Sequence, residues 1–186
     1  MSRHARRVAF ALAGLAAAVA SAPARPVAAA SAAELRRDSA AALKTLYASE
    51  PAAKMLSEKA KGILVFPSIV KGGFMVGGQI GEGSLWKRGK VVGYYNTVAA
   101  SYGLQAGIQK FGYALFFMND DALNQLDATK GFEIGVGPSI VVVDAGAAKS
   151  MTTNTLTSDV YAFIFSQKGL MAGMGIQGSK ITRVAK

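Results

Sequence analysis

The sequence predicts an α+β fold that is mainly β: a strongly curved antiparallel sheet or small barrel-like β-structure with N-terminal helices packed against it. Small residues and glutamines recur two positions apart in residues 76–83, 102–109 and 172–177. This period is typical of strands with two unlike faces. Glycine inside a strand marks a bend, a bulge or a close approach of two backbones, so these glycines favour a curved sheet. Hydrophobic residues make up 51% of the chain and charged residues 17%, which indicates a globular protein.

The first thirty residues have the pattern of a secretion signal. Arg3, Arg6 and Arg7 precede an apolar stretch over Val8–Ala20, which is too short to span a bilayer as a helix. Small residues near 30–32 suit cleavage there, although an uncleaved membrane anchor is the alternative. We therefore expect an exported bacterial protein, periplasmic, associated with the outer membrane or secreted. Residues 31–186 would form one domain, with a helical segment at 31–61 and a β-rich core at 62–186.

The composition of the chain excludes several classes of active site. The chain has no cysteine, and its one histidine, His4, lies in the leader. Thiolate catalysis, Ser-His-Asp triads and most zinc sites are therefore excluded for the mature chain. Cleavage after residue 30 would remove four arginines and lower the net charge from +10 to +6. A basic protein of this kind favours anionic partners such as lipid headgroups, whereas nucleic acid is incompatible with export. We expect no enzyme activity, cofactor or metal.

Two helices are expected before the strands. Ala32–Ala48 has apolar residues on one face, which predicts a helix that covers the core or, alternatively, lies on a membrane surface. Ser49 is expected to cap a second helix through Lys61, with Pro51 in its first turn. Asn119 or Asp120 is expected to cap a third over Asp121–Ala128.

Strands are expected over most of the remaining sequence. Lys87–Lys90 reads as a hairpin turn, Phe132–Val143 as a strand broken at Pro138, and Ala145–Thr157 as a loop. The other expected strands are Ile63–Phe66, Phe74–Gly81, Ser84–Lys87, Val91–Tyr95, Ala99–Lys110, Tyr113–Met118, Asp159–Ser166, Leu170–Gln177 and Lys180–Val184.

Several segments, in order, resemble the SYLF domain. They are Ala60–Pro67, Lys71–Phe74, Gly77–Gly83, Ser101–Gln109, Ala114–Asn119, Val136–Pro138, Val160–Phe163 and Gln167–Gly173. The resemblance runs from about Ala33 to Arg183. It implies a single domain that binds membrane lipids, notably phosphoinositides in eukaryotic members, where the family is linked to actin patches. An amphipathic N-terminal helix and a basic surface are associated there with membrane contact.

This chain departs from the eukaryotic members because it carries a secretion signal and no second module. Those departures argue against phosphoinositides and actin as native partners and favour anionic bacterial phospholipid. Many bacterial members resemble lipoproteins, but this chain has no cysteine to carry a lipid anchor.

The hairpin tip is the best candidate for lipid contact. It places Trp86 beside Lys87, Arg88 and Lys90. Cations attract headgroup phosphates, and tryptophan is favoured at headgroup depth. The alternative is a solvated turn whose Trp86 covers the core.

Other cations are weaker candidates. Lys71, in a Lys-Gly-Gly loop, and Lys168 stand next to glycines that would let a phosphate approach backbone amides. Lys180 and Arg183 belong to a basic C-terminal stretch that also includes Lys186. The alternative for all of these residues is an ordinary solvated side chain.

Three further patterns are interpreted as structural. Asp120 and Asp121 suit a helix start better than a metal or acid–base site. Residues 78–83 lack the ending of a phosphate-binding loop. The strand glutamines Gln79, Gln105, Gln109 and Gln177 are expected to hydrogen-bond one another within the sheet.

The sequence thus predicts an exported, non-enzymatic domain that binds anionic phospholipid surfaces. A structural or protein-interaction component of the cell envelope is the second hypothesis. An enzyme using dispersed carboxylates is the third.

Overall fold

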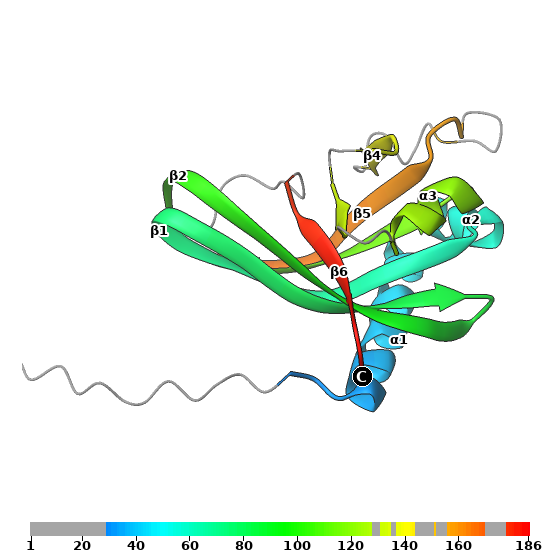
Figure 1. Cartoon of the computed structure of the whole chain (residues 1–186), viewed down its shortest axis with the longest axis horizontal. Helices are drawn as coiled ribbons and strands as arrows, with labels where there is room; N and C mark the ends of the chain where they lie inside the picture. Colours follow the sequence, from blue (N-terminus) through cyan, green and yellow to red (C-terminus); the bar gives the residue numbers. More distant parts are fainter. Residues whose placement is uncertain (1–28, 128–130, 135–136, 144–150, 152–155, 170–177) are drawn as a thin grey trace, which may run out of the picture.

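The computed structural model describes residues 29–127, 131–134, 137–143, 151, 156–169 and 178–186, with the backbone alone at 74–76, 101–106 and 169. Strands predominate, and helices pack against the curled sheet (Figure 1). In chain order the elements are α1 (Ala32–Ser49), α2 (Pro51–Lys59), β1 (Gly62–Lys87), β2 (Lys90–Phe117), α3 (Asp120–Gln125), β3 (Phe132–Glu133), β4 (Ile140–Val143), β5 (Val160–Gly169) and β6 (Lys180–Val184).

Helix α1 begins at a capping box. The Ser31 side chain accepts a hydrogen bond from the Glu34 amide, and the Glu34 carboxylate accepts one from the Ser31 amide. Leu35, Leu43 and Leu46 are buried against the sheet, which confirms α1 as a helix that covers the core. The prediction that Ser49 caps α2 was wrong: Glu50 holds that position, and the Ser49 hydroxyl donates to the Thr45 carbonyl inside α1.

Strands β1 and β2 form one very long antiparallel hairpin, paired from Gly62↔Phe117 to Lys87↔Lys90. The segments predicted as separate strands between Ile63 and Met118 are therefore parts of two continuous strands. Pro67 is accommodated at a bulge between Phe66 and Ile69, because a proline has no amide to donate at that point. Lys71 lies within β1, not in the loop that its neighbouring glycines predicted.

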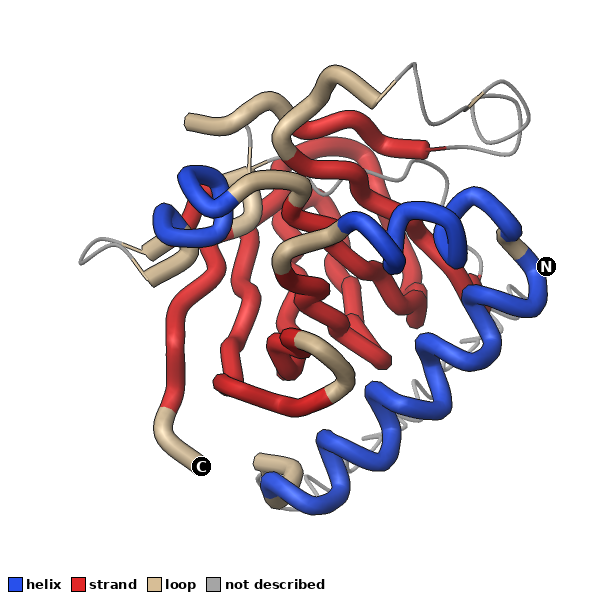
Figure 2. The backbone as a smooth tube through the Cα atoms, turned by 90° about the vertical axis from the view of Figure 1, so that its right-hand side faces the viewer, coloured by secondary structure: helices blue, strands red, loops and turns tan. Residues whose placement is uncertain are grey.

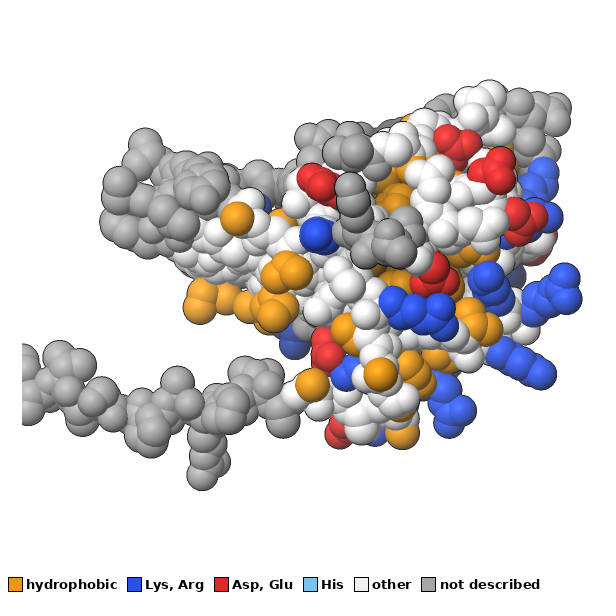
Figure 3. All heavy atoms as spheres, in the orientation of Figure 1, with side chains coloured by type: hydrophobic (Ala, Val, Ile, Leu, Met, Phe, Trp, Pro, Cys, Tyr) orange, Lys and Arg blue, Asp and Glu red, His pale blue; other side chains and the backbone are white. Residues whose placement is uncertain are grey.

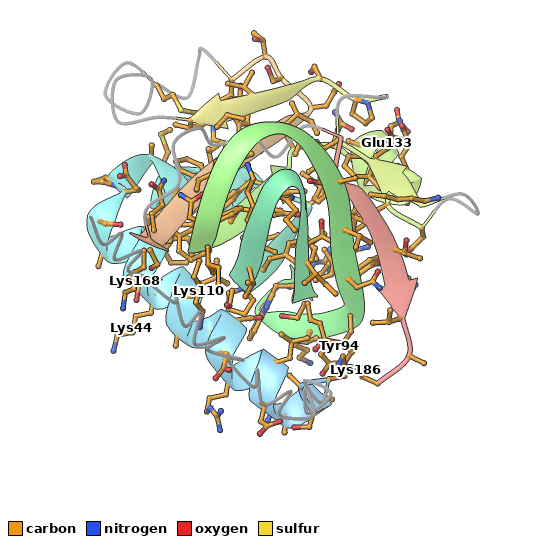
Figure 4. All side chains as sticks on the ribbon, turned by 90° about the vertical axis from the view of Figure 1, so that its left-hand side faces the viewer. Lys44, Tyr94, Lys110, Glu133, Lys168 and Lys186 are labelled. Atoms are coloured by element: carbon orange, nitrogen blue, oxygen red, sulfur yellow. The ribbon has the colours of Figure 1, made fainter. Side chains whose placement is uncertain are left out.

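The hairpin folds over in its middle, so that β1 forms an arch nested inside the arch of β2 (Figure 4). We call its two halves the base limb, Gly62–Val70 with Lys110–Phe117, and the turn limb, Gln79–Lys87 with Lys90–Ala99. The limbs meet at two glycines. A Cβ on Gly83 would lie 2.6 Å from the Val65 carbonyl oxygen and 2.7 Å from the Phe66 ring, and one on Gly81 would lie 2.2 Å from Ile69 Cδ1. This close approach is the role that the glycine pattern predicted.

A hydrogen bond also joins the limbs across the interior. The Tyr113 hydroxyl of the base limb donates to Thr97 Oγ1 of the turn limb over 3.0 Å, and both residues are fully buried. Burial raises the pKa of Tyr113 far above its usual value, so the phenol stays protonated.

The remaining strands extend the sheet from the outer edge of β2. Its turn-limb part pairs with β6 and its base-limb part with β5, which gives the order β3-β6-β2-β5-β4, with β1 on the other side of β2. Lys180–Val184 is a strand as predicted. The predicted curved, antiparallel sheet is confirmed, and among the described strands one pair is parallel, β4 with β5.

Along most of the base limb both faces are buried. Leu64, Phe66 and Tyr113 point inward, into a cluster closed by α3 and β6. Ile63, Val65 and their neighbours point outward, beneath α1 and α2. Figure 2 shows α1 running obliquely along this outer side. Alternation of two apolar sets along one strand explains why the sequence there reads as a nearly continuous hydrophobic run.

Asp159 ties together the elements around α3. Asn119 caps α3 by accepting from the Ala122 amide, and its side-chain amide donates to Asp159 over 2.7 Å. Ser139, just before β4, donates to Asp159 through its amide and its hydroxyl, each over 3.0 Å. The predicted strand Phe132–Val143, broken at Pro138, is present as two short strands, β3 before Pro138 and β4 after it. The predicted strand Leu170–Gln177 and most of the loop Ala145–Thr157 lie outside the described residues.

The contact between the limbs predicts that two glycine substitutions will have very different effects on the free energy of unfolding. Gly83→Ala should lower the free energy of unfolding by about 1–3 kcal/mol, because its methyl group would enter space held by the Val65 carbonyl and the Phe66 ring. Gly72→Ala is the matched control, since a Cβ there meets no atom closer than 3.7 Å. Urea unfolding measures both, and equal stabilities would contradict the fold-over.

The Asp159 network predicts a loss of stability in acid. Hydrogen bonds from the Ser139 amide and then from the Asn119 and Ser139 side chains lower the pKa of Asp159 below its ordinary value of 3.8. A lowered pKa in the folded state adds stability above pH 3.8, which is lost as the pH falls through the folded-state pKa. In urea titrations, Asp159→Asn should be less stable than wild type at neutral pH, and the gap should close in acid. A gap that is independent of pH would refute this role.

Candidate functional site

The turn that joins β1 to β2 concentrates positive charge at some cost to folding. Lys87 and Lys90 are cross-strand partners, and like charges directly opposite one another are destabilising. Between them, Arg88 and Gly89 have φ values of +50° and +74°. Two-residue hairpin turns with both residues in this left-handed region strongly prefer Asn-Gly, so arginine is an unfavourable choice at the first position. Such a local conflict points to a function other than folding.

The end of α2 and the short connection to β1 bring two more cations to this turn. Lys59, Lys61, Lys87, Arg88 and Lys90 are all exposed and line one hollow of about 750 Å³; we call them the turn cluster. Glu58 and Asp120 are the acidic residues on its wall. Figure 3 shows blue side chains gathered at the end of the molecule where this turn lies in Figure 1. The surface is therefore strongly positive and open to solvent.

Trp86 is half-buried and packs against the outer cluster beneath α1 and α2. Its indole nitrogen donates to Ser84 Oγ over 2.8 Å. It also lines a smaller hollow with Leu43, Tyr47 and Arg88. The structure thus gives Trp86 the core-covering role that the sequence left as the alternative, and its contacts hold the turn cluster against the helices.

Lys71 lies on the concave inner face, where its side chain is only 8% exposed. Its cross-strand partner Gln109 is also buried, and its Oε1 has no hydrogen-bond partner among the described residues. The expected glutamine network is wrong for Gln79, whose amide donates to Ser179 Oγ over 2.6 Å. The side chains of Gln105 and Gln177 lie outside the described residues.

The other predicted cations lie apart from the turn. Arg183 donates to Asp127 over 3.1 Å and to the Val92 carbonyl over 3.3 Å, so it braces β6. Lys180 is exposed on β6, and Lys168 is exposed on β5 opposite Lys110. The structure brings together Trp86, Lys87, Arg88 and Lys90 and separates them from Lys71, which is buried.

Sequence reasoning missed Lys59 and Lys61. The signal for Lys59 was present, because a basic residue in the last turn of a helix is favoured by the helix dipole. Its position beside a turn some thirty residues later depends on the packing of α2 against the hairpin. The full turn cluster can hold a polyanion or a row of phosphate groups by charge attraction, with hydrogen bonds from the Arg88 guanidinium.

Comparisons with known proteins give one family match. Residues 98–186 match the model of the Ysc84 family, described as Las17-binding protein actin regulator. The match includes the motifs at Ser101–Gln109 and Ala114–Asn119, whereas the glycine-rich motifs before residue 98 lie outside it. A search of curated proteins found no match. None of the described helices has both the length and the apolar character needed to cross a membrane.

The strained turn predicts a gain of stability on substitution. Arg88→Asn should raise the free energy of unfolding by up to about 1 kcal/mol, because asparagine tolerates a positive φ better than arginine. Chemical denaturation measures the change. Lys54→Asn, at an exposed position inside α2, should instead be neutral or destabilising. If Arg88→Asn destabilised the fold, the arginine would have a structural role and the argument from local conflict would fail.

Proposed function

Since residues 98–186 belong to the SYLF-domain family, we propose that the chain is a non-enzymatic domain that binds anionic phospholipid membrane surfaces through the turn cluster. The observation that carries this proposal is Arg88, held in a left-handed conformation between two lysines that oppose each other. An anionic surface would offset the repulsion that the folded protein retains there.

The shape of the cluster suits a surface. Its five cations are exposed: Lys87, Arg88 and Lys90 sit at the projecting hairpin turn, and Lys59 and Lys61 lie beside its base. Each lysine or arginine near an anionic leaflet contributes about 1 kcal/mol to binding, so several acting together give a substantial affinity. Because this attraction is electrostatic, binding should weaken as ionic strength rises.

We further propose that the protein acts after export, in the periplasm or at the outer membrane. The support is the leader pattern of Arg3, Arg6 and Arg7 followed by Val8–Ala20. The lipids available there would be anionic bacterial phospholipids. Ser31 is the cap of α1, so cleavage before Ser31 would retain the cap while cleavage after Ala32 would remove it.

Vesicle flotation tests the proposed function. The protein should float with vesicles that contain phosphatidylglycerol at low salt, and not with phosphatidylcholine alone. Combining Lys87→Glu, Arg88→Glu and Lys90→Glu should weaken binding roughly 100-fold or more, at about 1 kcal/mol per cation lost. Arg88→Asn should also bind more weakly, although it folds more stably.

A matched control keeps the same change of net charge. Arg36, Lys54 and Lys180 are exposed cations on three different elements, and reversing them together should weaken binding much less. Equal losses in the two triple variants would mean that net charge alone drives binding. Wild-type protein that ignores anionic vesicles would overturn the proposal and leave the envelope-protein partner as the better hypothesis.

A further inference from the structure

A second pair of opposed lysines lies on the base limb. Lys110 of β2 and Lys168 of β5 are direct cross-strand partners, and both are exposed. Partners in an antiparallel pair project from the same face with their Cβ atoms about 5 Å apart, so these two charges repel one another. Lys44 of α1 is also exposed, and Figure 4 shows it on the same side of the molecule as Lys110 and Lys168. Folding alone gives no reason for three cations here.

Two exposed aliphatic side chains adjoin the lysines. Val70 of β1 is the other cross-strand partner of Lys110 and is 45% exposed. Ile108, two residues before Lys110, is 71% exposed, the highest value among the large hydrophobic residues of the described chain. Its partner across the ladder is Gly72, which has no side chain to cover it. We call Lys44, Val70, Ile108, Lys110 and Lys168 the base-limb patch.

The patch exists because the helices cover only part of the outer face of the base limb. Ala114 and Phe116 of β2 point outward into the cluster beneath α1 and α2. By alternation along β2, Lys110 and Ile108 point the same way, but they lie nearer the bend and both are exposed. A bulge in β5 then sets the pairing: Gly112 faces Phe165 and Lys110 faces Lys168, with Ser166 at φ +54° between them. The bulge therefore brings Lys168 opposite Lys110.

We infer that the base-limb patch is a second membrane contact, which docks on an anionic bilayer with Ile108 among the headgroups and the three lysines on phosphates. The inference rests on the proposed function and adds a surface outside the turn cluster. Exposed aliphatic side chains next to clustered lysines suit the interface of an anionic bilayer. There, burial of the apolar side chains and attraction of the lysines to phosphates both favour binding.

The absence of cysteine allows a direct test with a single environment-sensitive dye. Ile108→Cys, labelled with a nitrobenzoxadiazole dye, should show a blue shift and brighter emission on vesicles of phosphatidylglycerol and phosphatidylcholine. Ile80→Cys is the matched control, because Ile80 is 61% exposed on the outer face of the turn limb, away from the patch. Its dye should keep the spectrum that it has in buffer.

A charge variant provides the second arm. Lys110→Gln with Lys168→Gln should weaken flotation roughly 10-fold or more, since each cation near an anionic surface gives a several-fold gain in affinity. The same variant should unfold at an equal or higher urea concentration, because it removes a repulsive pair. Lys54→Gln with Lys180→Gln is the control of equal charge and should have a smaller effect on flotation.

The outcomes separate the two proposals. If wild type floats but the dye at residue 108 behaves as it does at residue 80, the base-limb patch is not a membrane contact and the turn cluster stands alone. Full binding by the Lys110 and Lys168 double variant would overturn the inference in the same way. If wild type does not float at all, both the proposed function and this inference fail.

Discussion

The close contact between the two limbs of the β1–β2 hairpin is the constraint on which the rest of the structure depends. Gly81 and Gly83 leave room for the Val65 carbonyl, the Phe66 ring and Ile69, so one long hairpin can fold over and enclose its own core. The Tyr113–Thr97 hydrogen bond holds the same halves together across the interior. If the hairpin did not fold over, it would form a single open sheet with its inner aromatic face exposed to water. Exposing that apolar area would be strongly unfavourable.

The fold-over also decides which surfaces remain free. It gives each limb an outer face. Helices α1 and α2 cover most of the outer face of the base limb. The sheet continues past the helices and exposes the base-limb patch, while the hairpin turn projects beyond the core beside the end of α2. Both surfaces carry directly opposed lysines, Lys87 with Lys90 and Lys110 with Lys168. Retained repulsion at two sites of one sheet is the physical basis for proposing an anionic partner.

Elements with local signals could be predicted from the sequence, and elements set by distant pairing could not. The helix at Ala32–Ala48, the turn at Lys87–Lys90 and strand β6 follow from short-range patterns. Lys71 was predicted to lie in a loop because Pro67, Gly72 and Gly73 are residues that usually end a strand. In the structure a bulge after Phe66 accommodates the proline, and β1 continues through the glycines. Lys59 and Lys61 join the turn cluster only through the packing of α2. Lys168 meets Lys110 only through a β5 bulge that no spacing in the sequence reveals.

The fold-over is tested most directly by proton NMR of the folded chain. The account predicts nuclear Overhauser contacts between the Gly83 α-protons and the Phe66 ring, and between Gly81 and the Ile69 δ-methyl group, with Gly83 shifted by the ring current. Residues so far apart along one strand cannot touch if the hairpin runs straight. Absence of these contacts, with the β1–β2 ladder otherwise intact, would contradict the account and with it the placement of both basic surfaces.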